Sequence, residues 1–230
     1  MRFLVVLAVL AVVFCVIFAA RHRAGRTQPL ESLAADLHGH TVCIDPGHGG
    51  TQPGAETDGI RESDLTLAIA LQLRDILEDA GATVLMTRET DTDVGLEERA
   101  GMANDAGAEL FVSIHQNILP DNASVHGAET WIYSAQTQDA VALASQIQSC
   151  LIARTGAEDR GIYESSGLVV LNRTQMAACL VECGFMSNGS ELERLSSEQG
   201  QAQIALGIAE GVAAYLTGET VPAYAVRAQS

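Results

Sequence analysis

Short β-branched runs alternate with longer helical patterns from residue 41 to residue 215, and this alternation constrains the fold more than any other feature of the sequence. Residues 41–44 (TVCI) end at an Asp-Pro-Gly turn, as a strand does. Residues 63–80 then place apolar side chains at helical spacing, and Gly81 marks the end of that helix. Strands that alternate with helices form layers around a parallel sheet. We therefore predict a single α/β domain whose mostly parallel central sheet is flanked by helices.

The same patterns predict where the remaining elements lie. Strands are expected at 83–86, 110–114, 128–133, 168–171 and 178–182, and helices at 95–106, 137–154 and 197–215. Ligands of such sheets bind beyond the carboxyl ends of the strands. His48 follows the first strand, His115 ends the third and Glu182 ends the last, so their side chains are expected at one edge of the sheet. Glu62 arrives there separately, just before the first helix.

His48, Glu62 and His115 supply the ligand set of a hydrolytic zinc site. Such sites bind zinc through three protein ligands, often two histidines and a carboxylate, and leave the fourth position to water. The metal lowers the pKa of this water to about 7 and polarises the scissile carbonyl, so hydroxide can attack an amide. A second carboxylate must take the proton of the water and pass it to the leaving nitrogen. Glu182 is the candidate for this role.

The sequence around His48 separates it from an ordinary solvated histidine. It reads Asp-Pro-Gly-His-Gly-Gly, and its glycines permit tight turns and a close approach to a ligand. Asp45 could orient the ring of His48 through its second nitrogen. His38 and His40 are interpreted as solvated linker residues, and His126 as a loop residue.

The chain resembles the zinc-dependent N-acetylmuramoyl-L-alanine amidases of the amidase_3 type between Thr41 and Leu216. The matching segments are residues 44–50 (IDPGHGG), Glu62 with the following helix, Thr87-Arg88 with Asp91, 96–99 with Asn104, 113–117 (SIHQN) and 180–188 (LVECGFMSN). The resemblance implies a phosphorylase/hydrolase-like α/β fold, zinc ligands at His48, Glu62 and His115, and Glu182 as catalytic base and acid. It also implies cleavage of the bond between the lactyl group of N-acetylmuramic acid and L-alanine in peptidoglycan.

The sequence departs from the family pattern at two places. Gln116 stands where the family usually has Ala, and Ala177 stands where it usually has Pro. A glutamine beside the metal could narrow the cleft or bond to the peptide stem. Three arginines, Arg88, Arg99 and Arg160, match family positions and are interpreted as scaffold residues that form salt bridges with Asp91 or Glu97.

An unbroken apolar run from Phe3 to Ala20, followed by basic residues, predicts contact with a membrane. It fits either a cleaved signal peptide or a retained anchor. Both interpretations predict export, to the cell envelope or beyond it. The expected organisation is therefore a signal or anchor at 1–20, a linker at 21–37, a catalytic domain at 38–217 and a C-terminal tail at 218–230.

The net charge of −16 argues against nucleic acid as a partner, because electrostatic repulsion would oppose its approach. Peptidoglycan is the expected partner instead, with the membrane contacted through the N-terminal segment. The four cysteines outside the apolar run (Cys43, Cys150, Cys179 and Cys183) are interpreted as reduced residues, and their spacing does not select a disulfide.

Two other functions stay open at this point. The same metal and base would serve a zinc peptidase that cuts within peptide stems, and an inactive wall-binding relative could keep the fold. The short connections between residues 154 and 182 leave no room for the long inserted segment that covers the metal in some family members. We therefore expect an open site that needs no activator.

Overall fold

The computed structural model describes residues 33–135, 138–221 and 223–228, and Leu33–Ser230 form a compact unit. The apolar run from Phe3 to Ala20 and most of the expected linker lie outside the described residues. Among the helices that are described, none is long and apolar enough to cross a membrane.

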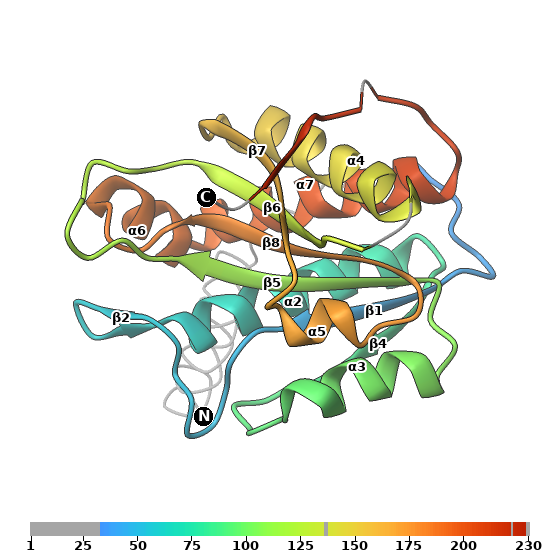
Figure 1. The fold of residues 1–230 in the computed structure, drawn as a ribbon, viewed down its shortest axis with the longest axis horizontal. Helices are drawn as coiled ribbons and strands as arrows, with labels where there is room; N and C mark the ends of the chain where they lie inside the picture. Colours follow the sequence, from blue (N-terminus) through green and yellow to red (C-terminus); the bar gives the residue numbers. More distant parts are fainter. Residues whose placement is uncertain (1–32, 136–137, 222, 229–230) are drawn as a thin grey trace, which may run out of the picture. The chain divides into compact units, whose positions relative to one another are not determined.

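The central sheet of the described chain contains seven strands (Figure 1). They are β1 (Thr41–Pro46), β4 (Thr83–Met86), β5 (Leu110–Asn117), β6 (Ala128–Tyr133), β7 (Asp159–Ser165), β8 (Ala177–Phe185) and β9 (Val226–Ala228). Their spatial order is β4-β1-β5-β8-β6-β7-β9. Every neighbouring pair is parallel except β6 with β8. The predicted α/β fold with a mostly parallel sheet is confirmed.

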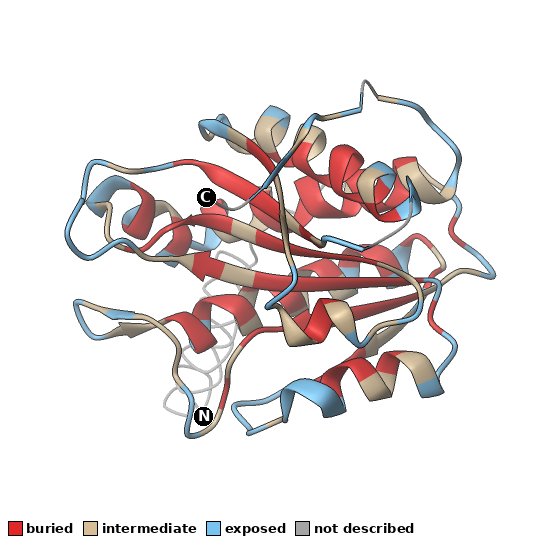
Figure 2. Cartoon of the chain, viewed as in Figure 1, coloured by how far each residue is buried: buried red, intermediate tan, exposed pale blue. Residues whose placement is uncertain are grey.

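Helices cover both faces of this sheet. One face carries α2 (Glu62–Asp79), α4 (Gln138–Thr155) and α7 (Glu198–Leu216), and the other carries α3 (Leu96–Asp105) and α5 (Val169–Asn172). Buried residues follow the strands and the inner sides of the helices (Figure 2). The larger core includes Ile69, Ile147 and Ile208, and the smaller one includes Phe111 and Leu171. Strands β5 and β8 contribute to both cores, which explains their nearly continuous apolar sequence.

A hairpin that the sequence did not reveal delivers the chain to the start of α2. It consists of β2 (Glu56–Thr57) and β3 (Ile60–Arg61), which pair antiparallel. Asp58 and Gly59 form its turn with φ angles of 52° and 80°. Positive φ at both central residues is what a tight hairpin turn of this kind requires, and Asp-Gly is a favoured sequence for it. Glu62 therefore follows a rigid turn.

The predicted strand at 168–171 is wrong, because residues 169–172 form helix α5. Val170 and Leu171 are buried against the sheet. The run is therefore apolar because a short helix packs there, and not because it is a strand. A short apolar run does not distinguish a buried helix from a strand. The strand of this region is β7, which ends at Ser165, six residues before the predicted end of the strand. The sequence also did not predict the eight-residue helix α6 (Gly189–Ser196).

Residues just outside both predicted limits of the catalytic domain belong to its core or its sheet. Leu37, in the expected linker, is fully buried in the larger core. Strand β9, in the expected C-terminal tail, pairs in parallel with β7 at the edge of the sheet. The cysteines Cys43, Cys179 and Cys183 are buried and, like the half-buried Cys150, form no disulfide.

Candidate active site

Glu62 lies between His48 and His115 at the carboxyl edge of the sheet. Its Oε2 atom is 3.1 Å from His48 Nε2, and its Oε1 atom is 2.9 Å from His115 Nδ1. The two imidazole rings meet edge to face with their centroids 4.9 Å apart. One ligand atom from each of the three residues lies within 4.8 Å of the others. The three predicted ligands are thus brought together, as a shared metal ion would need.

Two glycines let the backbone approach these side chains. A Cβ atom on Gly47 would lie 2.3 Å from Cε1 and Nε2 of His115, and one on Gly54 would lie 2.5 Å from Oε2 of Glu62. His48 itself has a φ of 61°, which is uncommon for a residue with a side chain. Left-handed conformations outside glycine carry strain and concentrate at functional sites.

Glu62 is held in the ionised state that a metal ligand requires. Its side chain is 5% exposed, and this burial alone would raise its pKa. Hydrogen bonds from His115 and His48, together with their electrostatic interaction with the carboxylate, outweigh burial and lower the pKa of Glu62 well below the usual range. The backbone N–H groups of Ala55 and Gln116 also donate to the carboxylate, at 3.0 Å each.

Asp45 does not orient the ring of His48 as expected from the sequence. Its buried carboxylate accepts from Thr87 Oγ1 at 2.6 Å, Ser113 Oγ at 2.7 Å and Arg99 Nη1 at 2.7 Å. These three donors come from the end of β4, from β5 and from α3. Asp45 therefore ties the elements around β1 together, and its effect on His48 is indirect.

Two buried arginines hold the backbone that carries His48. Arg99 donates to the carbonyl oxygens of Pro46 and His48 at 2.7 Å each. Arg88 donates to the carbonyl oxygens of Pro46 and Gly47 at 2.9 Å each. The salt bridges expected with Asp91 or Glu97 are wrong for both residues: Arg88 donates to uncharged oxygens, and the carboxylate partner of Arg99 is Asp45. Hydrogen bonds from a charged donor contribute about 1.5–3 kcal/mol each, so the loop is firmly fixed.

Glu182 reaches the same edge from β8. It is paired with His115 on β5 and with Glu129 on β6, so the three side chains project from the same face of the sheet. Its Oε2 atom is buried and has no hydrogen-bond partner among the described residues. Burial, followed by the negative charges of Glu62 and Glu129, raises the pKa of Glu182 well above its usual range. A cation nearby would favour the ionised form instead, so this group can exchange a proton.

A family model described as Amidase_3, N-acetylmuramoyl-L-alanine amidase, matches residues 42–214. The chain belongs to the Amidase_3 family. Among its relatives, YqiI of Bacillus subtilis, an uncharacterised protein, is 38% identical over 188 residues, which cover 81% of this chain and 90% of YqiI. The germination-specific N-acetylmuramoyl-L-alanine amidase of the same species is 30% identical over 220 residues, which cover 90% of this chain and 92% of that enzyme.

Solved structures agree with this family membership. The crystal structure of an N-acetylmuramoyl-L-alanine amidase from Clostridium difficile 630 superposes with a TM-score of 0.75 at 38% identity. The match covers 79% of this chain and 98% of that structure. The amidase fold thus extends over nearly all of the catalytic domain expected from the sequence.

In this member of the family, Glu129 organises a polar cluster beside Glu182. It is buried, and its carboxylate accepts from Arg160 Nε at 2.8 Å, Asn117 Nδ2 at 2.9 Å and Trp131 Nε1 at 3.2 Å. Arg160 therefore pairs with Glu129 and not with the acids expected from the sequence. Glu129 was missed because no local pattern signals it: it meets Glu182 only through the antiparallel pairing of β6 with β8.

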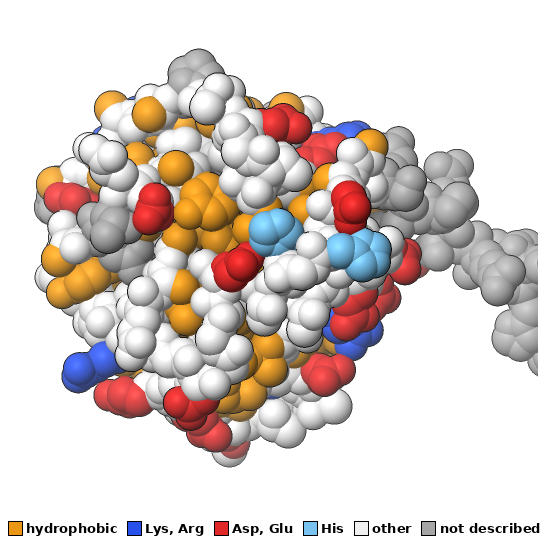
Figure 3. All heavy atoms as spheres, turned by 90° about the vertical axis from the view of Figure 1, so that its right-hand side faces the viewer, with side chains coloured by type: hydrophobic (Ala, Val, Ile, Leu, Met, Phe, Trp, Pro, Cys, Tyr) orange, Lys and Arg blue, Asp and Glu red, His pale blue; other side chains and the backbone are white. Residues whose placement is uncertain are grey.

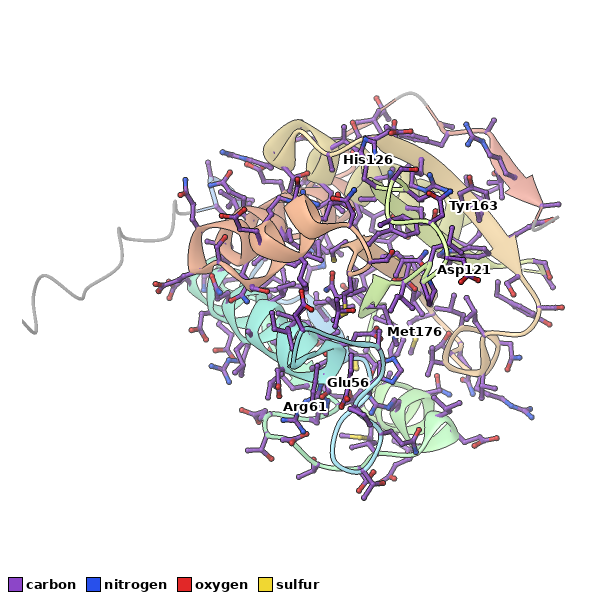
Figure 4. The ribbon with its side chains drawn as sticks, turned by 90° about the vertical axis from the view of Figure 1, so that its left-hand side faces the viewer. Glu56, Arg61, Asp121, His126, Tyr163 and Met176 are labelled. Carbon is purple, nitrogen blue, oxygen red and sulfur yellow. The ribbon has the colours of Figure 1, made fainter. Side chains whose placement is uncertain are left out.

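A cavity of about 290 Å³ opens beside Glu182. Its lining residues are Asn117, Trp131, Ser165, Leu168, Leu180 and Glu182. Figure 4 looks onto the edge of the sheet that carries the site, with Glu56 and Arg61 of the β2–β3 hairpin low in the view. Asp121 of the β5–β6 loop and Tyr163 of β7 lie higher. The cavity adjoins the candidate metal centre through Glu182, whose paired residue on β5 is His115.

Gln116, which departs from the family pattern, does not face this cleft. It is 3% exposed, and neither atom of its side-chain amide has a hydrogen-bond partner among the described residues. Neighbouring residues of a strand point to opposite faces, so Gln116 faces away from the side of the sheet that carries His115. The expectation that it narrows the cleft is wrong, and its backbone N–H serves the site instead.

The three other histidines that the structure describes lie outside this constellation. His38 is 2.6 Å from Asp36, His40 is 2.7 Å from Glu109 and His126 is 3.0 Å from Glu158, in each case between a ring nitrogen and a carboxylate oxygen. His38 and His126 are largely exposed, in line with their interpretation as solvated residues. None of the three joins the metal-ligand group found among the described residues.

Proposed function

We propose that the protein is a zinc-dependent amidase that hydrolyses the bond between the lactyl group of N-acetylmuramic acid and L-alanine in peptidoglycan. Membership of the Amidase_3 family supports this reaction and this substrate. The observation that carries the proposal is the convergence of His48, Glu62 and His115 with Glu182 at one edge of the sheet.

The donor set fits zinc. Two imidazole nitrogens and one carboxylate are a common ligand set of hydrolytic zinc sites, and the ionised state of Glu62 suits this role. His48, Glu62 and His115 would hold the ion. When bound, zinc supplies a Lewis acid that activates water and polarises the scissile carbonyl.

Glu182 acts as the proton carrier of the reaction. Its carboxylate takes the proton of the attacking water and then donates it to the amino nitrogen of L-alanine as the C–N bond breaks. This exchange leaves a carboxylic acid on the lactyl group and a free amine on the stem peptide. Arg88 and Arg99 contribute by keeping the loop of His48 in position.

The site needs no activator to become accessible. Between α4 and β8, the described chain contains strand β7 and the four-residue helix α5 as its regular elements. Neither is a long insertion that could cover Glu62 and its two histidines. Added activators are therefore expected to leave the rate on purified peptidoglycan unchanged.

The protein acts outside the cytoplasmic membrane. Peptidoglycan lies there, and the apolar run from Phe3 to Ala20 provides either a cleaved signal peptide or an anchor. Sequencing the N-terminus of the mature protein distinguishes these two forms.

Digestion of purified peptidoglycan tests the proposal. Mass spectrometry of the products should find intact stem peptides with a free L-alanine amine, and a chelator should stop their release until zinc is returned. Glu182→Gln should lower the rate by about 10²–10⁴-fold. Cut stem peptides would identify a peptidase instead, and the absence of products would identify a wall-binding relative. A Glu182→Gln protein with full activity would show that Glu182 is not the base.

A further inference from the structure

Trp131 and Tyr163 form a stacked aromatic pair beside the cavity. They are paired residues of the parallel strands β6 and β7, and their ring centroids lie 5.1 Å apart with an interplanar angle of 26°. The guanidinium of Arg227, from β9, lies over the Tyr163 ring at 5.7 Å from its centroid. Arg227 also donates to the carbonyl oxygen of Arg160 at 2.9 Å. The C-terminal strand thus supports the aromatic pair from its outer side.

Trp131 is fixed on its other sides as well. Its Nε1 donates to the carboxylate of Glu129 at a distance of 3.2 Å. Glu129 is the residue of β6 that is paired with Glu182 of β8. Tyr163 stacks on the Trp131 ring, and Trp131 lines the cavity together with Leu180. The cavity therefore has a rigid aromatic wall at a short distance along the sheet from the candidate base.

The polar lining of the cavity selects against an anionic occupant. Asn117 and Ser165 are neutral, no lining residue is basic, and the one acidic residue that lines the cavity is Glu182. Glu129 adds a second carboxylate immediately behind Trp131, and its partner Arg160 is engaged with it. Stem peptides carry free carboxylates, which this environment would repel.

An N-acetylated sugar meets every requirement of this lining. It is neutral while the lactyl carboxyl is tied up in the amide bond. The C–H face of its ring can pack on an aromatic side chain, and its hydroxyl and acetamido groups can bond to Asn117 and Ser165. Hydrolysis creates a lactyl carboxylate next to Glu129 and Glu182, so the same cavity would favour release of the product.

We propose that this cavity binds the N-acetylated sugar on the glycan side of the scissile bond, with Trp131 as its stacking platform and Tyr163 and Arg227 as supports. The inference rests on the proposed amidase function for the position of the substrate. Trp131 is then a specificity-determining residue, and recognition of the glycan is separate from the metal chemistry.

Trp131 is the single tryptophan of the chain, so its fluorescence reports on this cavity alone. The full-length protein, stripped of metal by a chelator, is titrated with the trimer of N-acetylglucosamine and, separately, with a free stem tripeptide. A saturable change of intensity or wavelength with the trimer and none with the tripeptide is expected. A response to the tripeptide alone, or to neither probe, overturns the inference. Because no metal is present, this result does not depend on whether the protein is an active amidase.

A kinetic comparison provides the second measurement. Trp131→Ala should raise KM for a soluble N-acetylglucosaminyl-muramoyl peptide by about 5- to 10-fold while kcat changes little, and Trp131→Phe should restore most of the loss. Tyr215→Ala, which removes a half-buried aromatic ring from α7 on the other face of the sheet, is the matched control and should leave KM unchanged. Circular dichroism verifies that all three variants fold. An unchanged KM in folded Trp131→Ala would overturn the proposal even if the enzyme proves to be a zinc amidase.

Discussion

Glu182 of β8 and His115 of β5 occupy paired positions on adjacent parallel strands. The spacing of the candidate base and the candidate ligand is therefore set by the hydrogen bonds of the sheet and not by a loop. Such a pair is a rigid support, and it brings the carboxyl of Glu182 close to the negative charge of Glu62.

This closeness has a measurable effect on the stability of the metal-free protein. The pKa of Glu182 is higher in the folded state than its ordinary value in the unfolded chain, so the folded protein binds more protons than the unfolded chain at pH values between the two. Glu182 therefore reduces stability as the pH rises through this range, by up to about 1.4 kcal/mol per pH unit. We expect Glu182→Gln to unfold at a higher temperature than the unchanged protein, with a difference that grows from pH 5 to pH 8. A difference that is constant with pH would contradict the raised pKa.

Substitution of Gly47 tests whether the backbone at this position must approach the ring of His115 closely. A methyl group at this position would overlap the imidazole ring, since its Cβ would lie 2.3 Å from Nε2. We expect Gly47→Ala to displace the ring and to weaken zinc binding by about 10- to 100-fold, as measured by competition with a chromophoric chelator. Gly101→Ala is the matched control, because a Cβ at that helical position meets nothing within 4 Å. Equal zinc affinities of the two variants would exclude this steric role.

The sequence predicted the parts of the fold that depend on long, regular patterns. The 18-residue helix α2 was recognised from apolar residues such as Ile69 and Leu73, which are buried in the structure. The short segments failed, because the four apolar residues at 168–171 fit a strand and a buried helix equally well. Strand β9 lies in a region with no strong pattern and owes its place to pairing with β7.

In the candidate site, too, local sequence motifs indicated some residues, whereas others depend on contacts between distant parts of the chain. The ligand set and Glu182 were predicted because glycine-rich and strand-end motifs point to them. The residues that position them were not, because their contacts join distant parts of the chain: Asp45 bonds to Thr87 and Arg99, and Glu129 bonds to Arg160. Charge pairing between neighbours in sequence suggested other partners. Spacing along the chain carries no information on contacts of this kind.

Zinc binding should stabilise the folded protein by mass action. A ligand that binds only the folded state adds about 2.7 kcal/mol of stability at a free concentration of 100 times its Kd. We expect zinc to raise Tm in calorimetry, and His115→Ala to abolish most of this rise. His126→Ala is the control, because His126 contacts Glu158 and lies outside the ligand group. An equal rise of Tm in His115→Ala would place the zinc elsewhere.

Removal of one partner from the buried pair of Asp45 and Arg99 should strongly destabilise the folded protein. The two side chains are 1% and 4% exposed, and Arg99 Nη1 lies 2.7 Å from Asp45 Oδ1. Loss of one partner from a buried pair destabilises a protein by about 3–5 kcal/mol. We expect the free energy of unfolding in urea to fall by this amount in Arg99→Met. The double variant Arg99→Met with Asp45→Asn should lose less than the sum of the losses in the two single variants. Arg74→Met, which removes exposed ion pairs with Asp75 and Glu89, should have little effect. Strictly additive losses would show that Asp45 and Arg99 are not coupled.

The acidic surface predicts how activity depends on salt. The chain has a net charge of −16, and the face shown in Figure 3 carries many acidic side chains and few basic ones. Bacterial walls contain anionic polymers, so the protein is repelled from its substrate at low ionic strength. The screening length shortens from about 30 Å at 0.01 M salt to about 10 Å at 0.1 M. We therefore expect the initial rate on whole walls to rise over this range, and the rate on a small neutral muramoyl peptide to stay nearly constant. A rate on walls that falls steadily from the lowest salt concentration would mean that local positive charge, and not the net charge, controls the encounter.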